Sequence, residues 1–116
     1  MGAPVMQFQF VSSKPDEVAA FYKTLFGWTV TAGNALGYRE IETGAGIGGG
    51  IWPAPPGTPG FVQLFIGVPD VDQSVAQAVA LGAEVVVPAT TLPDGDTMAV
   101  LRDPTGVTFG VMLRRA

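Results

Sequence analysis

Residues 5–11 read VMQFQFV, a stretch in which apolar and polar side chains alternate. Apolar side chains at positions 6, 8 and 10 alternate with Gln7 and Gln9. A period of two is typical of a β-strand that has one apolar and one polar face. The strand is therefore expected to bury its aromatic face and to present Gln7 and Gln9 on the other side.

An amphipathic helix is expected directly after this strand. Ser12 and Ser13 are candidate N-caps, and Pro15 with Asp16 suits a first helical turn. Apolar residues then recur at the spacing of one helix stripe, namely Val18, Phe21, Tyr22, Leu25 and Phe26. Gly27 suits the left-handed position that ends a helix, so the helix is predicted to end there.

Three short strands complete this first module. They are predicted at Trp28–Thr31, Tyr38–Glu42 and Ile47–Trp52, with turns marked by Gly33-Asn34 and Gly44. The segment from Pro53 to Gly60 is rich in proline and glycine, and it is expected to be a semi-rigid linker. Residues 1–53 are thus predicted to form a βαβββ module, with a linker at residues 53–60.

The same order of elements returns in residues 61–116. Residues 61–67 alternate again, with Val62, Leu64 and Ile66 on the apolar face, and Gln63 takes the place that Gln7 has in the first module. A second helix is expected to start at a capping box of Asp70 and Gln73 and to end at Gly82. Strands are predicted at 84–87, 97–102 and 107–113. The sequence therefore predicts two tandem modules of the same kind.

The composition limits the functions that need to be considered. The chain has 6 basic and 10 acidic residues and a net charge of −4, without a basic stripe, which argues against nucleic acid and anionic membranes as partners. It has no cysteine and no histidine, so disulfides, thiolate nucleophiles and histidine bases are excluded. No apolar run is long enough to span a membrane and no signal peptide is visible, so a cytoplasmic protein is expected.

Four short motifs, in the right order, resemble the vicinal oxygen chelate superfamily of glyoxalases, bleomycin-resistance proteins and dioxygenases. They are FYKTLFGW at residues 21–28, VPDVD at 68–72, ALG at 80–82 and DPTGVTF at 103–109. The resemblance implies that the modules curl into a mixed sheet around a cavity, and it implies a homodimer. Together with the internal repeat, it predicts an α+β fold of two tandem βαβββ modules.

The resemblance also implies where a metal ion would bind, because metal-using members take ligands from the first and last strand of each module. In this chain those positions hold Gln7, Gly50, Gln63 and Gly110. Glutamine is a weak neutral ligand and glycine has no side chain, so this set does not favour a tight divalent metal site. We therefore expect no metal and no cofactor, with Glu40 or Glu42 able to add at most one carboxylate.

The faces opposite the core residues supply a candidate ligand site. It combines amides, aromatic rings and glycines that leave room, and it comprises Gln7, Gln9, Tyr38, Gly50, Trp52, Phe61, Gln63, Phe65, Thr108, Gly110 and Met112. Aromatic rings with a few amides suit a flat, mostly apolar small molecule. The alternative interpretation is a filled core, in which the aromatic rings only occupy space and Gln7 bonds to Gln63.

Three hypotheses of different classes follow from these observations. The leading one is a metal-free protein that sequesters or senses an aromatic or drug-like molecule. The second is a lyase, isomerase or dioxygenase with a non-standard site, and the sequence leaves open whether the chain is an enzyme. The third is a dimeric interaction scaffold with a filled core. All three stay open at this point, because a fold does not by itself determine a function.

Overall fold

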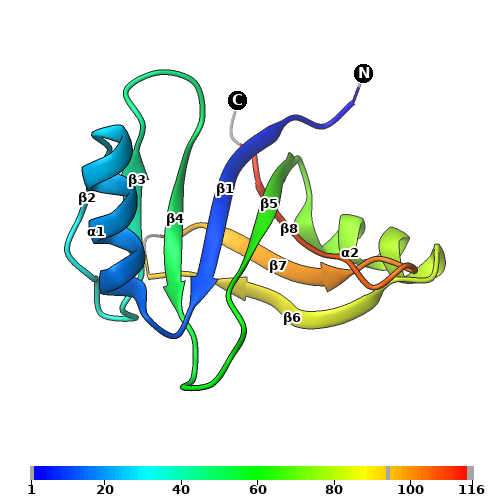
Figure 1. Cartoon of the computed structure of the whole chain (residues 1–116). Helices are drawn as coiled ribbons and strands as arrows, with labels where there is room; N and C mark the ends of the chain where they lie inside the picture. Colours follow the sequence, from blue (N-terminus) through cyan, green and yellow to red (C-terminus); the bar gives the residue numbers. More distant parts are fainter. Residues whose placement is uncertain (1, 94, 115–116) are drawn as a thin grey trace. The chain divides into compact units, whose positions relative to one another are not determined.

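The computed structural model of the chain describes residues 2–93 and 95–114. Its elements are, in order, β1 (Val5–Ser12), α1 (Pro15–Phe26), β2 (Thr29–Val30), β3 (Arg39–Glu42), β4 (Gly48–Pro53), β5 (Phe61–Val68), α2 (Val71–Ala80), β6 (Glu84–Thr91), β7 (Thr97–Arg102) and β8 (Thr108–Leu113) (Figure 1). Each half of the chain thus runs through one strand, one helix and three more strands. The predicted α+β fold of two βαβββ modules is confirmed.

The chain divides into two compact units. The first unit is residues 7–63, and the second unit takes in the described residues before 7 and after 63. The unit boundaries therefore cut through β1 and β5, whereas the sequence indicated a boundary in the segment between β4 and β5.

The sheet of the first unit is mixed, and its strand order is β2-β3-β4-β1. β1 runs parallel to β4, and the register places Gln7 opposite Gly48 and Gln9 opposite Gly50. β3 runs antiparallel to β4, with Glu40 opposite Gly50. Because paired residues of neighbouring strands point to the same face of a sheet, Gln9, Gly50 and Glu40 share one face.

The sheet of the second unit repeats this topology in the order β5-β8-β7-β6. β5 runs parallel to β8, with Phe65 opposite Gly110, and β7 is antiparallel to both of its neighbours. Phe65 and Gly110 therefore take the places that Gln9 and Gly50 have in the first unit. The internal repeat of the sequence is a repeat of strand pairing as well.

The ends of both helices follow from local sequence. Gly27 has a φ of 74° and its N–H donates to the carbonyl oxygen of Lys23, as the predicted left-handed helix end requires. The predicted cap of α2 is also confirmed, because the Asp70 carboxylate accepts a hydrogen bond from the N–H of Gln73 at 3.0 Å. The serine cap of α1 is displaced: Lys14 is the N-cap residue, and Ser12 Oγ accepts from its N–H at 3.0 Å.

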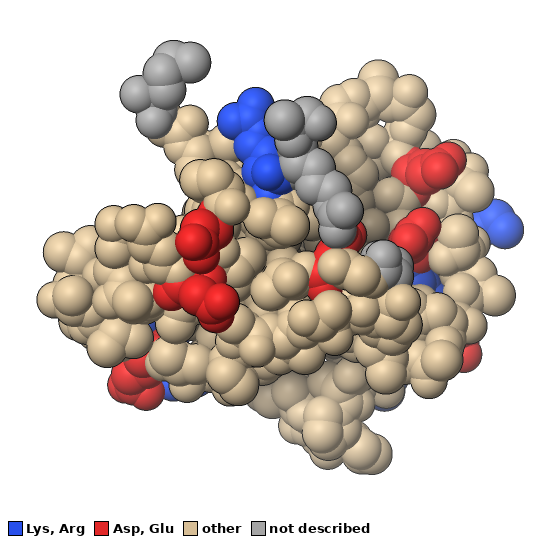
Figure 2. Space-filling view, turned by 180° about the vertical axis from the view of Figure 1, so that it is seen from behind, with Lys and Arg blue, Asp and Glu red and all other residues tan. Residues whose placement is uncertain are grey.

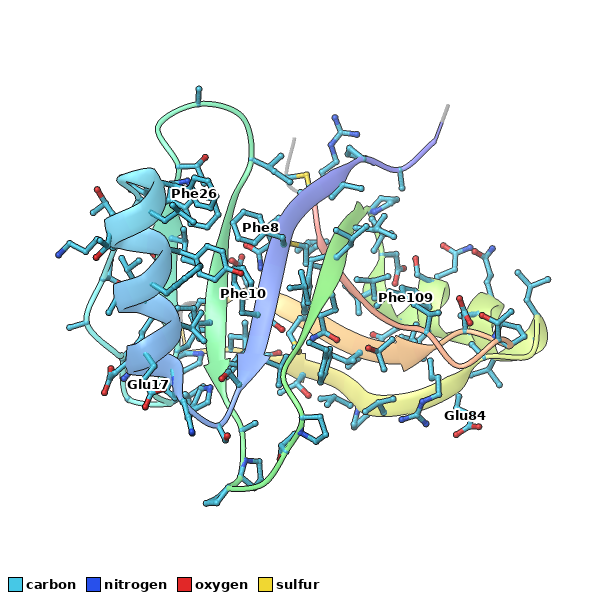
Figure 3. The ribbon with its side chains drawn as sticks, in the orientation of Figure 1. Phe8, Phe10, Glu17, Phe26, Glu84 and Phe109 are labelled. Atoms are coloured by element: carbon cyan, nitrogen blue, oxygen red, sulfur yellow. The ribbon has the colours of Figure 1, made fainter. Side chains whose placement is uncertain are left out.

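An aromatic cluster joins β1 to α1 in the first unit. Phe8 and Phe10 extend from β1 toward the helix that carries Phe26 (Figure 3). The Phe10 ring centroid lies 4.8 Å from that of Tyr22, and the Phe8 centroid lies 5.6 Å from that of Trp28. Each such ring pair contributes on the order of 0.5–1.5 kcal/mol beyond the area it buries. The cluster fixes the aromatic face of β1 against α1, so Gln7 and Gln9 point away from the helix.

Both faces of the second unit's sheet are packed. On the side of α2, a cluster of Val68, Val71, Ala99 and Val111 is buried, and Val75 of α2 packs against it. On the other side, Phe65, Met98 and Val100 form a second buried cluster, with Met112 packed against it. The second unit therefore has an apolar lining on the face that is polar in the first unit.

Several apolar residues that the sequence assigned to the core are in fact exposed. On α1, Phe21 and Leu25 are each 59% exposed. On β5, Val62 is 54% exposed and Leu64 is 47% exposed. An amphipathic pattern identifies an apolar face but not what covers it, and this is why the assignment was wrong here. On α1, the side chains of Phe21 and Leu25 leave an apolar surface that the chain itself does not bury.

Charged side chains are few on the surface of the molecule. On the face that Figure 2 shows, uncharged residues predominate, and the basic side chains lie apart from one another.

Within residues 2–93 and 95–114, neither α1 nor α2 has the length and apolar character that a bilayer-crossing helix needs.

Candidate functional site

The predicted site residues fall into two groups. Gln7, Gln9, Tyr38, Gly50, Trp52, Phe61 and Gln63 lie in the first unit, and Phe65, Thr108, Gly110 and Met112 lie in the second. In the first unit, the register of β1 with β4 places Gln7, Gln9, Gly50 and Trp52 on the face opposite the aromatic cluster. We call this face, with Tyr38, Glu40 and Gln63, the amide face.

The centre of the amide face is a buried pair of glutamines. Gln9 is 2% exposed and Gln63 is 5% exposed, and they are the buried polar residues of the described chain. Gln63 Nε2 donates a hydrogen bond of 2.7 Å to Gln9 Oε1. Burial of an amide is costly unless it is hydrogen-bonded, so this bond is a condition for having two glutamines in this place.

The glutamine pair differs from the one that the sequence suggested. The filled-core interpretation paired Gln63 with Gln7, but Gln7 is only half-buried and the bond goes to Gln9. Gln7 and Gln9 are two residues apart and therefore point to the same face of β1. Only the register with the neighbouring strand determines which of them is buried.

A glycine beside the pair makes room for an aromatic ring. A Cβ atom on residue 50 would collide with the hydroxyl and the ring of Tyr38. The Tyr38 ring in turn lies beside Trp52, with centroids 4.8 Å apart and planes inclined at 47°. Gly50 therefore lets the phenol of Tyr38 lie across β4, next to the position that Gln9 faces. Amides and two aromatic rings thus occupy adjoining places on one face.

Two carboxylates that the sequence assigned no firm role lie at the margin of this face. Glu40 is opposite Gly50 in the ladder, and Glu42 is two residues further along β3, so both point to the same side as Gln9. Both are exposed. Glu40 and Glu42 lie two and four residues after Tyr38, which was predicted for the site, and this period of two is the signal that could have added the two carboxylates.

The predicted residues of the second unit have a packing role. The space that a side chain on Gly110 would need is filled by the Phe65 ring, which is 2% exposed. Met112 packs against the cluster that contains Phe65, while Thr108 is half-buried. Of these residues, the filled-core interpretation concerned Phe65, whose ring is buried together with Met98 and Val100. Phe61, at the first position of β5, is exposed.

The residues at the positions where the superfamily binds metal do not fit a divalent ion. Gly50 and Gly110 provide no side-chain ligand, and the Gln63 amide is engaged with Gln9. Among residues 2–93 and 95–114, no three or more carboxylates come together as metal ligands would. The side chains at these positions are therefore neutral amides, whereas a tightly bound divalent ion needs charged carboxylates or imidazoles as ligands.

Asp103 has a structural role. Its carboxylate accepts hydrogen bonds from the Thr105 hydroxyl at 2.6 Å and from the N–H groups of Thr105 and Val107. These bonds, above all that of the Thr105 hydroxyl, lower the pKa of Asp103 below its usual value. Asp103 thus starts the turn before β8, and its carboxylate is engaged in that turn.

Comparison with known proteins gives consistent matches over most of the chain. A family model of the glyoxalase-like domain matches residues 7–112. The proteins named "Putative glyoxylase CFP32" of Mycobacterium bovis and Mycobacterium tuberculosis are each 34% identical over 110 residues. The match covers 90% of this chain but 41% of each relative, so the chain spans about two fifths of the length of these curated relatives.

Solved structures share the fold at low sequence identity. A hypothetical protein of Bacillus halodurans has a TM-score of 0.72 and 12% identity, covering 100% of this chain and 97% of its own. A methylmalonyl-CoA epimerase of Streptomyces coelicolor has a TM-score of 0.68 and 17% identity, covering 98% and 99%. The epimerase of Mycobacterium tuberculosis has a TM-score of 0.69 and 14% identity, covering 97% and 88%. At these identities the likeness concerns the fold alone.

The glutamine pair is testable through non-additivity. Gln9→Met is expected to lower the free energy of unfolding by about 1–3 kcal/mol, because it leaves the buried Nε2 of Gln63 without an acceptor. The double variant Gln9→Met/Gln63→Met is expected to lose less than the sum of the single changes, since no buried polar group remains. Urea denaturation measures all three. Gln7→Met is the control, and additive losses would contradict a direct bond.

The contact of Tyr38 with Gly50 is testable in the same way. Gly50→Ala is expected to cost about 1–3 kcal/mol of unfolding free energy, because the added methyl group displaces the phenol. Tryptophan fluorescence should change as well, since Trp52 lies beside Tyr38. In a Tyr38→Ala background the same change should cost little. Gly60→Ala is the control, because a Cβ there meets its nearest neighbour at an ordinary 3.6 Å; an equal cost in both backgrounds would contradict the assignment.

Proposed function

The chain belongs to the glyoxalase-like domain family of the vicinal oxygen chelate superfamily, and we propose that it binds a flat, mostly apolar small molecule on the amide face without a metal ion. Such a protein sequesters or senses its ligand. The observation that supports this proposal is the buried bond between Gln9 and Gln63, which joins two neutral amides on this face. Of the two, Gln63 stands at a position from which metal-using members of the superfamily take a ligand.

The chemistry of the amide face supports binding more than catalysis. Amides donate and accept hydrogen bonds but do not exchange protons near neutral pH. The chain has no histidine and no cysteine, so its sequence offers neither an imidazole base nor a thiolate nucleophile. Orientation of a ligand by the amides and by the rings of Tyr38 and Trp52 is what these groups can supply.

The charges near the face indicate which ligands to exclude. Glu40 and Glu42 are exposed on the same side of β3, and the whole chain carries a net charge of −4. A negative ligand would be repelled by these carboxylates, whereas a neutral or positive one would not. The proposal is therefore restricted to neutral and cationic aromatic molecules.

The proposal is tested by calorimetric titration of the whole chain with a panel of neutral and cationic planar aromatic compounds, in the presence of a chelator. At least one compound is expected to bind with a micromolar Kd. Trp52→Ala is expected to weaken that binding by about tenfold or more, because a stacking surface is lost. Phe21→Ala is the matched control, since Phe21 lies on α1 and away from the amide face.

A different result would favour the enzyme hypothesis. If binding occurred only after one equivalent of nickel, zinc, manganese or iron had been added, and elemental analysis found that ion in the protein, metal-free binding would be wrong. The protein would then be a metalloenzyme with ligands other than the amides.

The exposed apolar side chains of α1 support a second proposal, a homodimer. Phe21, Leu25 and Phe26 are each more than half exposed and follow one another along one helix. A second copy of the chain is therefore the proposed occupant of this surface.

Light scattering coupled to size-exclusion chromatography tests the dimer. The unmodified chain is expected to elute at twice the mass of 12.0 kDa. Phe21→Ser/Leu25→Ser should shift it to the monomer, because two apolar contacts are lost from the interface. Leu81→Ser is the control, as Leu81 is 80% exposed at the end of α2. A monomer at all concentrations for the unmodified chain would contradict the proposal.

A further inference from the structure

One atom of the glutamine pair has no partner. Gln63 Nε2 donates to Gln9 Oε1, which fixes the orientation of the Gln63 amide, and the amide's own Oε1 is buried. This oxygen accepts no hydrogen bond within the described residues. Among the buried side-chain nitrogen and oxygen atoms of those residues, it is the one without a hydrogen-bond partner. Since buried carbonyl oxygens are nearly always hydrogen-bonded, an orphan acceptor requires an explanation.

Packing alone does not explain the glutamine. Methionine at both position 9 and position 63 would have a similar shape, would fill the same space and would leave neither amide of the pair unsatisfied. The same face of β5 carries Phe65 two residues later, which is buried without any polar atom. The strand therefore accommodates an apolar side chain at a buried position, and the acceptor at Gln63 is not demanded by the fold.

The surroundings of the orphan oxygen restrict what can donate to it. Gln63 is joined to Gln9, Gln9 is opposite Gly50, and the Tyr38 phenol lies across Gly50 beside Trp52. The amide face therefore carries two aromatic rings as well as its buried amides, and a ligand bound on this face would meet both kinds of group. The amides themselves are uncharged, and the carboxylates of Glu40 and Glu42 are exposed at the margin, so an ammonium group would be desolvated without a buried counter-charge.

We propose that the ligand donates one neutral N–H or O–H hydrogen bond to Oε1 of Gln63, and that the ligand class is planar aromatic molecules with such a donor on the ring edge. Lactams and related ring amides have this chemistry. The inference rests on the proposed function of the amide face and specifies its ligand. It makes Gln63 the residue that determines specificity, because an analogue without the donor leaves the buried oxygen unpaired.

A matched pair of probes tests the inference on the whole chain. Quinolin-2(1H)-one carries a ring N–H, and its N-methyl derivative differs by one methyl group in place of that hydrogen. Calorimetry is expected to show the N–H compound binding at least about tenfold more tightly to the unmodified protein. In Gln63→Met the two compounds should bind within about twofold of each other, whereas Gln7→Met should keep the difference.

The variant Gln9→Met/Gln63→Met repeats the comparison in a protein without buried amides, in case Gln63→Met alone folds poorly. Equal binding of the two probes to the unmodified protein would overturn the inference and leave the proposed function standing. A difference that persisted without Gln63 would also overturn it, because the donor would then meet another acceptor. If neither probe bound at millimolar concentration while other aromatic compounds of the panel did, the ligand class would be wrong; if none bound, the proposed function itself would fail.

Discussion

The packing of Phe8 and Phe10 against α1 is the constraint on which the rest of the first unit depends. The rings of Tyr22 and Trp28 meet these two side chains at 4.8 and 5.6 Å, so β1 cannot slip by one residue without losing its aromatic face to solvent. With that face fixed, Gln7 and Gln9 must point away from the helix. The parallel register with β4 then brings Gln9 opposite Gly50, and the amide pair and the Tyr38 phenol follow from that placement.

The two units share one strand topology, but the corresponding faces of their sheets differ in chemistry. Gln9 and Gly50 of the first unit correspond in strand pairing to Phe65 and Gly110 of the second. In both, the glycine makes room for an aromatic ring of the same unit, Tyr38 in the first and Phe65 in the second. The surrounding residues are amides in one case and a buried cluster with Met98 and Val100 in the other. Function is therefore sought where the repeat departs from apolar packing.

Local patterns in the sequence predicted much of the fold. Alternation identified β1 and β5, Gly27 and the Asp70 cap identified helix ends, and the repeat indicated two βαβββ modules. Strand ends differed by a residue or two, and β6 extends to Thr91 where a shorter strand was expected. The candidate site was harder, because register decides whether Gln7 or Gln9 is buried and no local pattern contains it. For the same reason the exposure of Phe21 and Leu25 was missed: amphipathicity does not say what covers a face.

If the amide face binds a small molecule without a metal ion, the side-chain amide signals of its glutamines respond to that ligand. Two-dimensional ¹H–¹⁵N NMR of the whole chain, without metal, would follow the NH₂ groups of Gln9 and Gln63 during titration with the tightest aromatic ligand. We expect both signals to shift with the ligand, while those of Gln73 and Gln77, which are exposed on α2, stay in place. Shifts confined to α1 or α2, with the Gln9 and Gln63 signals unchanged at saturation, would contradict the account.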